Sequence, residues 1–164
     1  MRTPASIAGH PIHPMIVPIA IGGFVLSFIF DVVRLAGGAP EPWASAAYCT
    51  MVGGIVAALC AAVPGLIDLL SLPAGTTRRV ALTHMGANLV VVALFIANAW
   101  LRHANAEAGG TPILLSVVGI ALLLFSGWLG GRMVFEAGVG VGADVNAAAT
   151  IPSGRPAGNR PLGT

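Results

Sequence analysis

The chain alternates between long apolar runs and short polar connections. Four runs contain almost no charged residue, namely residues 15–30, 42–67, 80–101 and 108–131. Each approaches or exceeds the roughly 20 residues that a helix needs to cross a bilayer. The runs are continuously apolar and do not alternate with polar positions as the strands of a membrane barrel do, so helices are favoured. The pattern predicts an all-α, up-down-up-down four-helix transmembrane bundle.

Proline, glycine and threonine mark the ends of these helices. They predict helices over residues 14–36, 43–71, 77–104 and 112–136, inside one transmembrane domain of residues 14–137. Residues 1–13 form an N-terminal segment that contains most of the HPIHP motif and lacks the features of a signal peptide. Residues 138–164 have too little apolar content to pack and are predicted to form a disordered cytoplasmic tail.

Composition and charge narrow the class of protein. With 56% hydrophobic residues, 9% charged residues and a mean hydropathy of +0.88, the chain is not a soluble globular domain, and its main partner is the lipid bilayer. A net charge of +2 is too small and too scattered for a nucleic-acid surface. Arginines favour one side of the predicted bundle by six to two, which predicts that both termini are cytoplasmic. The six are Arg2, Arg78, Arg79, Arg132, Arg155 and Arg160, and the two are Arg34 and Arg102.

The second and fourth predicted helices share a pattern. Gly54, Ile55, Leu59 and Gly65 align with Gly119, Ile120, Leu124 and Gly130, while His13 matches His84 loosely. Two hairpins of the same orientation would be related by an axis along the membrane normal, as in parallel repeats of transporters. The pattern therefore predicts that the domain contains an internal repeat.

The polar residues near these helices gather at one end of the predicted bundle. Ionisable side chains are costly in hydrocarbon and mark functional sites by default. The members of the cluster are His10, His13, Asp68, His84, Arg132 and Glu136. This end is therefore where any bound group is expected.

Spacing along each helix predicts the neighbours of some polar side chains. Asn88 lies four residues after His84 and can bond beside it, and Arg132 can pair with Glu136 at the same spacing. Asp68 competes for Arg132, and Asp31 is expected to pair with Arg34. Gly127 and Gly131 have the GxxxG spacing of closely packed membrane helices.

Several of these segments together resemble a known family. They are HPIHPMIVPIAIG, PGLIDLL, THMGAN and GWLGGRMVFEAGVGV, and they cover roughly residues 9–141. The chain resembles the small bacterial four-helix membrane proteins catalogued as domain of unknown function 2231, of which HPxHP is the most specific element. The resemblance implies a multi-pass protein of the bacterial inner membrane. It also implies a redox setting, since related domains are fused to Rieske iron–sulfur or cytochrome c modules, and it brings no established activity.

These residues favour a binding protein over an enzyme, and three hypotheses about its function follow. The first is a b-type haem between the first and third helices, with His13 and His84 as axial ligands. Arg132 with Arg78 or Arg79 would neutralise the propionates, and Asn88 would lie beside the site. The second is a zinc, iron or copper ion bound by His10, His13, His84 and Asp68. The third is a structural or accessory subunit without a ligand. A Rieske-type or cytochrome-type redox protein, or a second copy of the chain, is the expected protein partner.

Overall fold

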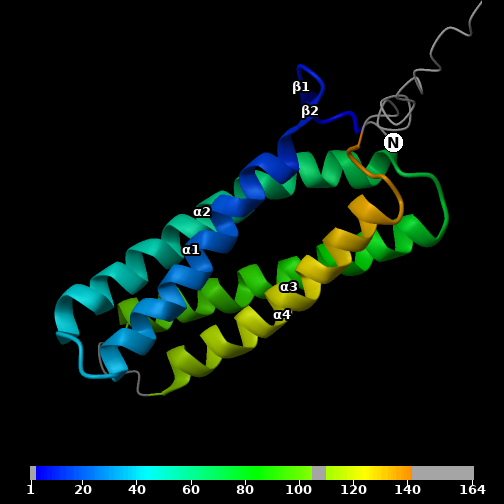
Figure 1. Cartoon of the computed structure of the whole chain (residues 1–164). Helices are drawn as coiled ribbons and strands as arrows, with labels where there is room; N and C mark the ends of the chain where they lie inside the picture. The colour runs from blue at the N-terminus through cyan, green and yellow to red at the C-terminus, as the bar shows by residue number, and fades with distance from the viewer. Residues whose placement is uncertain (1–2, 105–109, 142–164) are drawn as a thin grey trace, which may run out of the picture.

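Four long helices form almost all of the described chain (Figure 1). The computed structural model describes residues 3–104 and 110–141. The helices are α1 (Ile12–Leu35), α2 (Pro40–Ser71), α3 (Thr76–Ala104) and α4 (Thr111–Phe135). Their bounds lie within three residues of those that the sequence predicts.

The ends of the helices follow from local chemistry. Proline lies in the first turn of α2 and of α4, where its missing N–H costs nothing. After α1 the chain turns at Gly37, whose φ of 100° suits glycine. The N–H of Gly38 then donates to the carbonyl of Val33 at 3.0 Å and closes the helix end.

The two ends of the predicted domain need correction. The N-terminal segment forms a short antiparallel hairpin of β1 (Ser6–Ile7) and β2 (His10–Pro11), which the sequence pattern did not predict. Residues 138–141 are not part of a loose tail, since Val139 packs against the buried Leu69, Leu72 and Ala81. The rest of the predicted tail, residues 142–164, lies outside the described residues.

All four helices are long and apolar enough to cross a membrane. They contain 24 to 32 residues, with a mean hydropathy of 2.0 to 2.3 in their most apolar windows. At 1.5 Å per residue, even the shortest spans about 36 Å, more than the roughly 30 Å hydrocarbon core. Only 17 to 22% of the residues in these windows are buried, so most apolar side chains face outward. The fold is that of an integral membrane protein.

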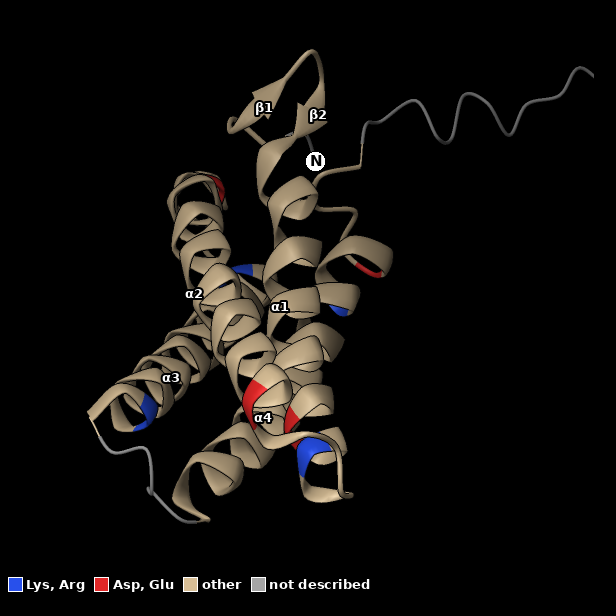
Figure 2. Ribbon diagram, turned by 90° about the vertical axis from the view of Figure 1, so that its left-hand side faces the viewer, with Lys and Arg blue, Asp and Glu red and all other residues tan. Residues whose placement is uncertain are grey.

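The bundle consists of two helical hairpins. Residue contacts are concentrated between α1 and α2 and between α3 and α4, and are much fewer between the two hairpins. Figure 2 shows the charged residues of the described chain confined mainly to the ends of the helices. Side chains of α1 and α3 meet across the diagonal of the bundle. The sequence prediction that these two helices face each other is confirmed.

The two hairpins repeat the same buried positions. On the first and third helices equivalent residues are 71 apart, as Asp31 and Arg102 are. On the second and fourth they are 65 apart, as Gly54 is from Gly119 and Gly65 from Gly130. The buried residues Ala20, Phe24 and Ser27 of α1 thus match the buried Val91, Phe95 and Asn98 of α3. The side-chain contacts agree with the internal repeat that the sequence predicts.

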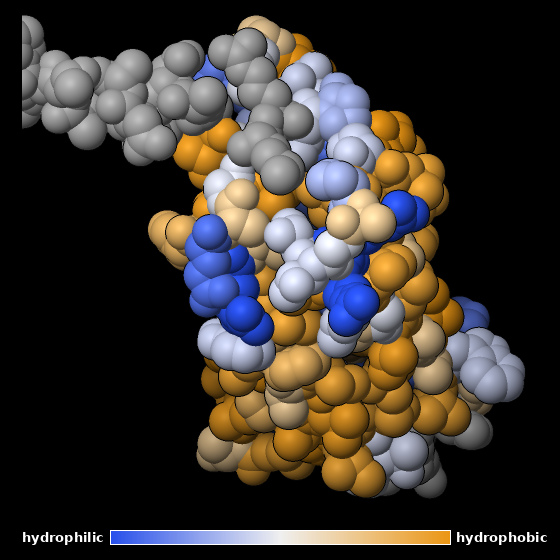
Figure 3. Space-filling view, turned by 90° about the vertical axis from the view of Figure 1, so that its right-hand side faces the viewer, coloured by the Kyte–Doolittle hydropathy of each residue, from blue (hydrophilic) through white to orange (hydrophobic). Residues whose placement is uncertain are grey.

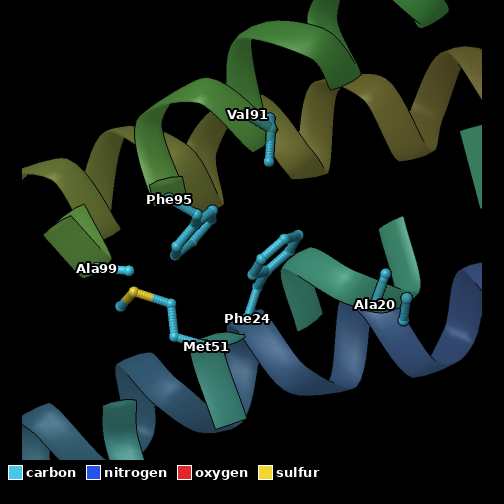
Figure 4. Close-up of a cluster of buried hydrophobic side chains, with 7 residues drawn as sticks. Ala20, Phe24, Met51, Val91, Phe95 and Ala99 are labelled. Carbon is cyan, nitrogen blue, oxygen red and sulfur yellow. The ribbon is translucent and has the colours of Figure 1, made fainter. Parts of the chain in front are cut away.

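Equivalent phenylalanines form the centre of the core. The rings of Phe24 and Phe95 stack with their centroids 4.1 Å apart and their planes at 7° (Figure 4). Each ring lies against a glycine of its own hairpin, because a Cβ on Gly54 or Gly119 would come within 2.9 Å of it. The glycines therefore let each ring sit against the neighbouring helix and reach its counterpart across the bundle.

At the end away from the histidines, a buried ion pair joins the hairpins. Arg102 donates from two nitrogens to the two carboxylate oxygens of Asp31, one of these bonds measuring 2.8 Å. Its Nε donates to Asn98, which donates in turn to Ser116. Asp31 and Asn98 are fully buried. The predicted pair of Asp31 with Arg34 is wrong, because the fully buried carboxylate is satisfied by α3 and not by its own helix.

Candidate functional site

The structure brings His13 and His84 together. His13 lies in the first turn of α1 and His84 in the third turn of α3, and their ring centroids are 6.4 Å apart with the planes at 85°. They lie at the end of the bundle that carries the N-terminal hairpin and the end of α4 (Figure 1). The two residues are equivalent in the repeat and lie at a similar depth in the bundle. They differ in their distance from the helix start, because α3 begins eight residues before His84 and α1 begins one residue before His13.

His13 is fixed by the backbone of α2. Its Nδ1–H donates to the carbonyl oxygen of Ala61 at 2.8 Å. The ring approaches this closely because residue 65 is glycine, where a Cβ would lie 2.7 Å from Nδ1. Gly65 therefore serves to admit the imidazole to the surface of α2.

His84 is fixed in the same way by α4, with additional polar neighbours. Its Nδ1–H points to the carbonyl oxygen of Ser126 at 2.8 Å and lies 2.9 Å from the hydroxyl of that serine. The hydroxyl donates to Oδ1 of Asn88, and Nδ2 of Asn88 donates to Nε2 of His84 at 3.0 Å. The predicted contact of Asn88 with His84 is confirmed.

Sequence reasoning missed Ser126. The available signal was a hydroxyl group inside the otherwise apolar stretch LLLFSGWL of the fourth helix. Ser126 corresponds to Ala61 in the repeat. His13 therefore contacts only the carbonyl oxygen of Ala61, whereas His84 contacts both the carbonyl oxygen and the hydroxyl of Ser126. Likewise Val17 stands where Asn88 stands in the second hairpin. The two imidazoles are thus held alike by the backbone but have different side-chain neighbours.

Nδ1 is protonated in both imidazoles, because a carbonyl oxygen can only accept. In the neutral form of the ring, Nε2 is then the atom that holds the lone pair. In metalloproteins a histidine ligand is commonly oriented in this way, by donating its other ring N–H to a backbone carbonyl. Nε2 of His84 accepts from Asn88, and Nε2 of His13 has no hydrogen-bond partner among residues 3–104 and 110–141.

The other predicted metal ligands lie apart from this pair. His10 is exposed, and its Nδ1 bonds to the carbonyl of Ala8 in the N-terminal hairpin. Asp68 accepts the N–H of Ala5 at 3.0 Å, so it holds the N-terminal segment and does not pair with Arg132. In the described ranges, no three His, Cys, Asp or Glu side chains are close enough to hold a metal ion together. The four-residue set is not assembled in this structure.

The arginines near this end differ in their contacts. Nε of Arg132 donates to both carboxylate oxygens of Glu136, at 3.0 and 3.2 Å, which confirms the predicted pair. The same guanidinium lies over the ring of Trp128, 5.2 Å from its centroid. Arg78 is half-buried and Arg79 exposed at the start of α3.

The glycines of α4 do not all have the predicted role. A Cβ on Gly127 or Gly131 would meet nothing within 4 Å, so the GxxxG pair makes no helix contact in the described chain. Gly119 and Gly130 do the packing instead, against Phe95 and His84. The predicted role of the GxxxG pair within this bundle is wrong, because these two glycines lie on the outward face of the helix.

Four apolar spans and a polar cluster at one end define the class as a multi-pass integral membrane protein with a four-helix bundle. The family described as predicted membrane protein, DUF2231, matches residues 9–143, which is most of the chain. The chain belongs to this family, and the resemblance found in the sequence is confirmed. No curated protein and no solved structure matched the chain.

Proposed function

We propose that this membrane protein binds a b-type haem through His13 and His84 and takes part in electron transfer. The observation that carries the proposal is the geometry of the two imidazoles. Each is anchored through Nδ1 by a backbone carbonyl at 2.8 Å, and the rings lie 6.4 Å apart across the diagonal of the bundle. Imidazole is a common axial ligand of haem iron.

The separation of the rings suits one metal atom between them. A metal bound by histidine lies about 2 Å from the ring nitrogen. Adding the distance from nitrogen to ring centre on each side gives a centroid separation of about 6 Å for a metal held by two imidazoles. The observed separation of 6.4 Å is close to this value.

Two histidines are sufficient for haem, since the porphyrin supplies the remaining four ligands of the iron. A single metal ion would draw on further side chains, and His10 and Asp68 are engaged elsewhere. The porphyrin plane would enter between the two hairpins, where contacts are fewer than inside each hairpin. Asn88 would release Nε2 of His84 when the iron binds.

The charged partners of the haem stay part of the proposal. Arg78, Arg79 and Arg132 lie at the same end as the histidine pair and are the cations available for the propionates. Arg132 also contacts Glu136 through Nε and Trp128 through the face of its guanidinium. A redox protein of the Rieske or cytochrome type is the expected partner at this face of the bacterial inner membrane.

The visible spectrum of the detergent-purified protein tests the proposal. We expect a Soret band that sharpens on reduction with dithionite, and its loss in both His13→Ala and His84→Ala. Either substitution leaves the iron with one protein ligand, which removes most of the affinity. Insertion into the membrane should persist, because apolar burial in lipid drives it.

Matched variants separate haem from the alternatives. His103→Ala lies at the other end of the bundle and should leave the spectrum unchanged, as should His10→Ala. Asn88→Val copies the residue found at the equivalent Val17 and should retain the haem. Zinc, iron or copper bound without a Soret band, and lost in His10→Ala, would favour the metal-ion alternative. A colourless, metal-free protein would favour the accessory subunit.

Both termini are expected on the cytoplasmic side. By the sequence, six arginines fall at the end of the bundle that carries the termini and two at the other end, and an excess of arginine marks the cytoplasmic side. Reporter fusions after Gly38 and after Gly75 should therefore report the periplasm and the cytoplasm, respectively. The reverse pattern would place the histidine pair, and its redox partner, at the periplasmic face.

A further inference from the structure

A cavity opens between α3 and α4 at the end of the bundle that carries the histidines. Its volume is about 210 Å³, and it is lined by Thr76, Thr77 and Val80 of α3 and by Arg132, Met133 and Glu136 near the end of α4. Figure 3 shows this side of the molecule, where hydrophilic side chains gather above a broad hydrophobic belt. The cavity thus lies where a membrane-spanning bundle passes from hydrocarbon into the headgroup layer.

The guanidinium of Arg132 is held in place and still has donors to offer. Its Nε is bonded to Glu136, and its plane lies over Trp128. The two terminal nitrogens have no hydrogen-bond partner within residues 3–104 and 110–141. A guanidinium in a fixed position with free terminal N–H groups is suited to a phosphate or carboxylate oxygen.

Other donors line the same cavity. The hydroxyls of Thr76 and Thr77 make no hydrogen bond in the described parts of the chain, whereas the hydroxyl of Thr83 bonds to the carbonyl of Arg79. The carboxylate of Glu136 is the acidic group of the lining, and Arg132 already occupies both of its oxygens. The free polar groups, two hydroxyls and the terminal N–H groups of Arg132, can all donate a hydrogen bond, which favours an anionic ligand.

The first hairpin differs from the second at the position that corresponds to Met133. By the spacing of the repeat this position is Asp68, whose carboxylate accepts the N–H of Ala5. The second hairpin has an apolar residue in place of the carboxylate, next to an arginine.

We infer that this cavity binds the phosphate of an anionic phospholipid. A water molecule takes about 30 Å³ of liquid, so about 210 Å³ admits a phosphate group but is smaller than a typical small-molecule pocket of roughly 300–1,000 Å³. Trp128 and Phe135, which are 60% and 90% exposed, lie on the outward face near Arg132, where acyl chains would run. Basic pockets between membrane helices on the cytoplasmic side bind such headgroups in other proteins.

Lipid titration of the detergent-solubilised protein tests this inference independently of haem. Phosphatidylglycerol should raise the thermal unfolding temperature, and phosphatidylcholine of the same chain length should not. Arg132→Gln should weaken the response to phosphatidylglycerol about tenfold in concentration. Glu136→Gln removes the carboxylate that competes with the lipid phosphate for Arg132, and it should strengthen the response to phosphatidylglycerol. Arg79→Gln removes an exposed arginine outside the cavity and should leave it unchanged.

Each other result would overturn the inference. Equal responses to the two lipids, or equal losses in Arg132→Gln and Arg79→Gln, would indicate unspecific attraction to the membrane surface. Competition by millimolar inorganic phosphate without any effect of lipid would indicate a site for a free anion. If Arg132→Gln fails to fold, Arg132→Lys keeps the charge and should show an intermediate response, while a response equal to wild type would exclude binding by the guanidinium fork.

Discussion

Replacing Asp31 with asparagine is expected to destabilise the protein by about 3–5 kcal/mol, the usual cost of breaking a buried ion pair by removing one partner. Asp31 is fully buried, and the side chain of Arg102 is 14% exposed. Without the carboxylate, the guanidinium stays among apolar helices with Asn98 as its remaining partner. Denaturant unfolding of the purified protein, followed by circular dichroism, measures the loss.

Two further variants show whether the charge pair itself is responsible. The exchange Asp31→Arg with Arg102→Asp should recover more than half of the lost stability, because the two positions are equivalent in the repeat and face each other. The control is Glu136→Gln, which breaks an exposed pair on one helix and should cost at most about 1 kcal/mol. A double variant as unstable as Asp31→Asn would show that the surrounding groups, and not the pairing of charges, fix the contact.

Gly23→Ala should be nearly as damaging, at about 3 kcal/mol, the upper part of the range for overpacking a tight core. A Cβ at this position would lie 2.7 to 2.8 Å from backbone atoms of Gly54 and Thr50. Backbone atoms cannot relieve the clash by a change of rotamer as a side chain can, so α1 and α2 would have to move apart. The measurement is again the free energy of unfolding in detergent.

The adjacent Gly22 provides the matched control. A Cβ there meets nothing within 4 Å, so Gly22→Ala should change stability by no more than about 0.5 kcal/mol. The two variants have the same chemistry and differ by one residue in position. Equal effects of the two would mean that α1 and α2 are not in close backbone contact at this level.

The sequence predicted the helices well because each depends on a continuous local pattern. Apolar runs bounded by proline and glycine are visible in the chain, and all four helices appeared within three residues of their predicted bounds. Pairs on one helix, such as Arg132 with Glu136 and His84 with Asn88, were predicted for the same reason. The short hairpin at the N-terminus was missed, since two-residue strands have no detectable period.

Contacts between helices were harder to predict, because they depend on how the helices rotate about their axes. Asp31 was assigned to the nearest arginine in the chain, whereas its partner is 71 residues away. For the same reason the GxxxG spacing of Gly127 and Gly131 did not show which side of the helix they would face. The histidine pair was predicted correctly as facing residues of α1 and α3, although the sequence gives no distance between them. Both the contribution of Ser126 and the separation of His10 and Asp68 from the pair required coordinates.

The pairing of Asp31 with Arg102 shows where the two hairpins must differ. If two identical copies of one hairpin met about the same axis, each equivalent position would face itself, and two buried aspartates or two buried arginines would be opposed. Like charges at that separation would repel strongly in a medium that screens them poorly. In this chain the two halves differ at the position, so that one supplies the acid and the other the base. The charge pair thus favours the packing of the α1–α2 hairpin against the α3–α4 hairpin, and it disfavours the packing of either hairpin against a second copy of itself.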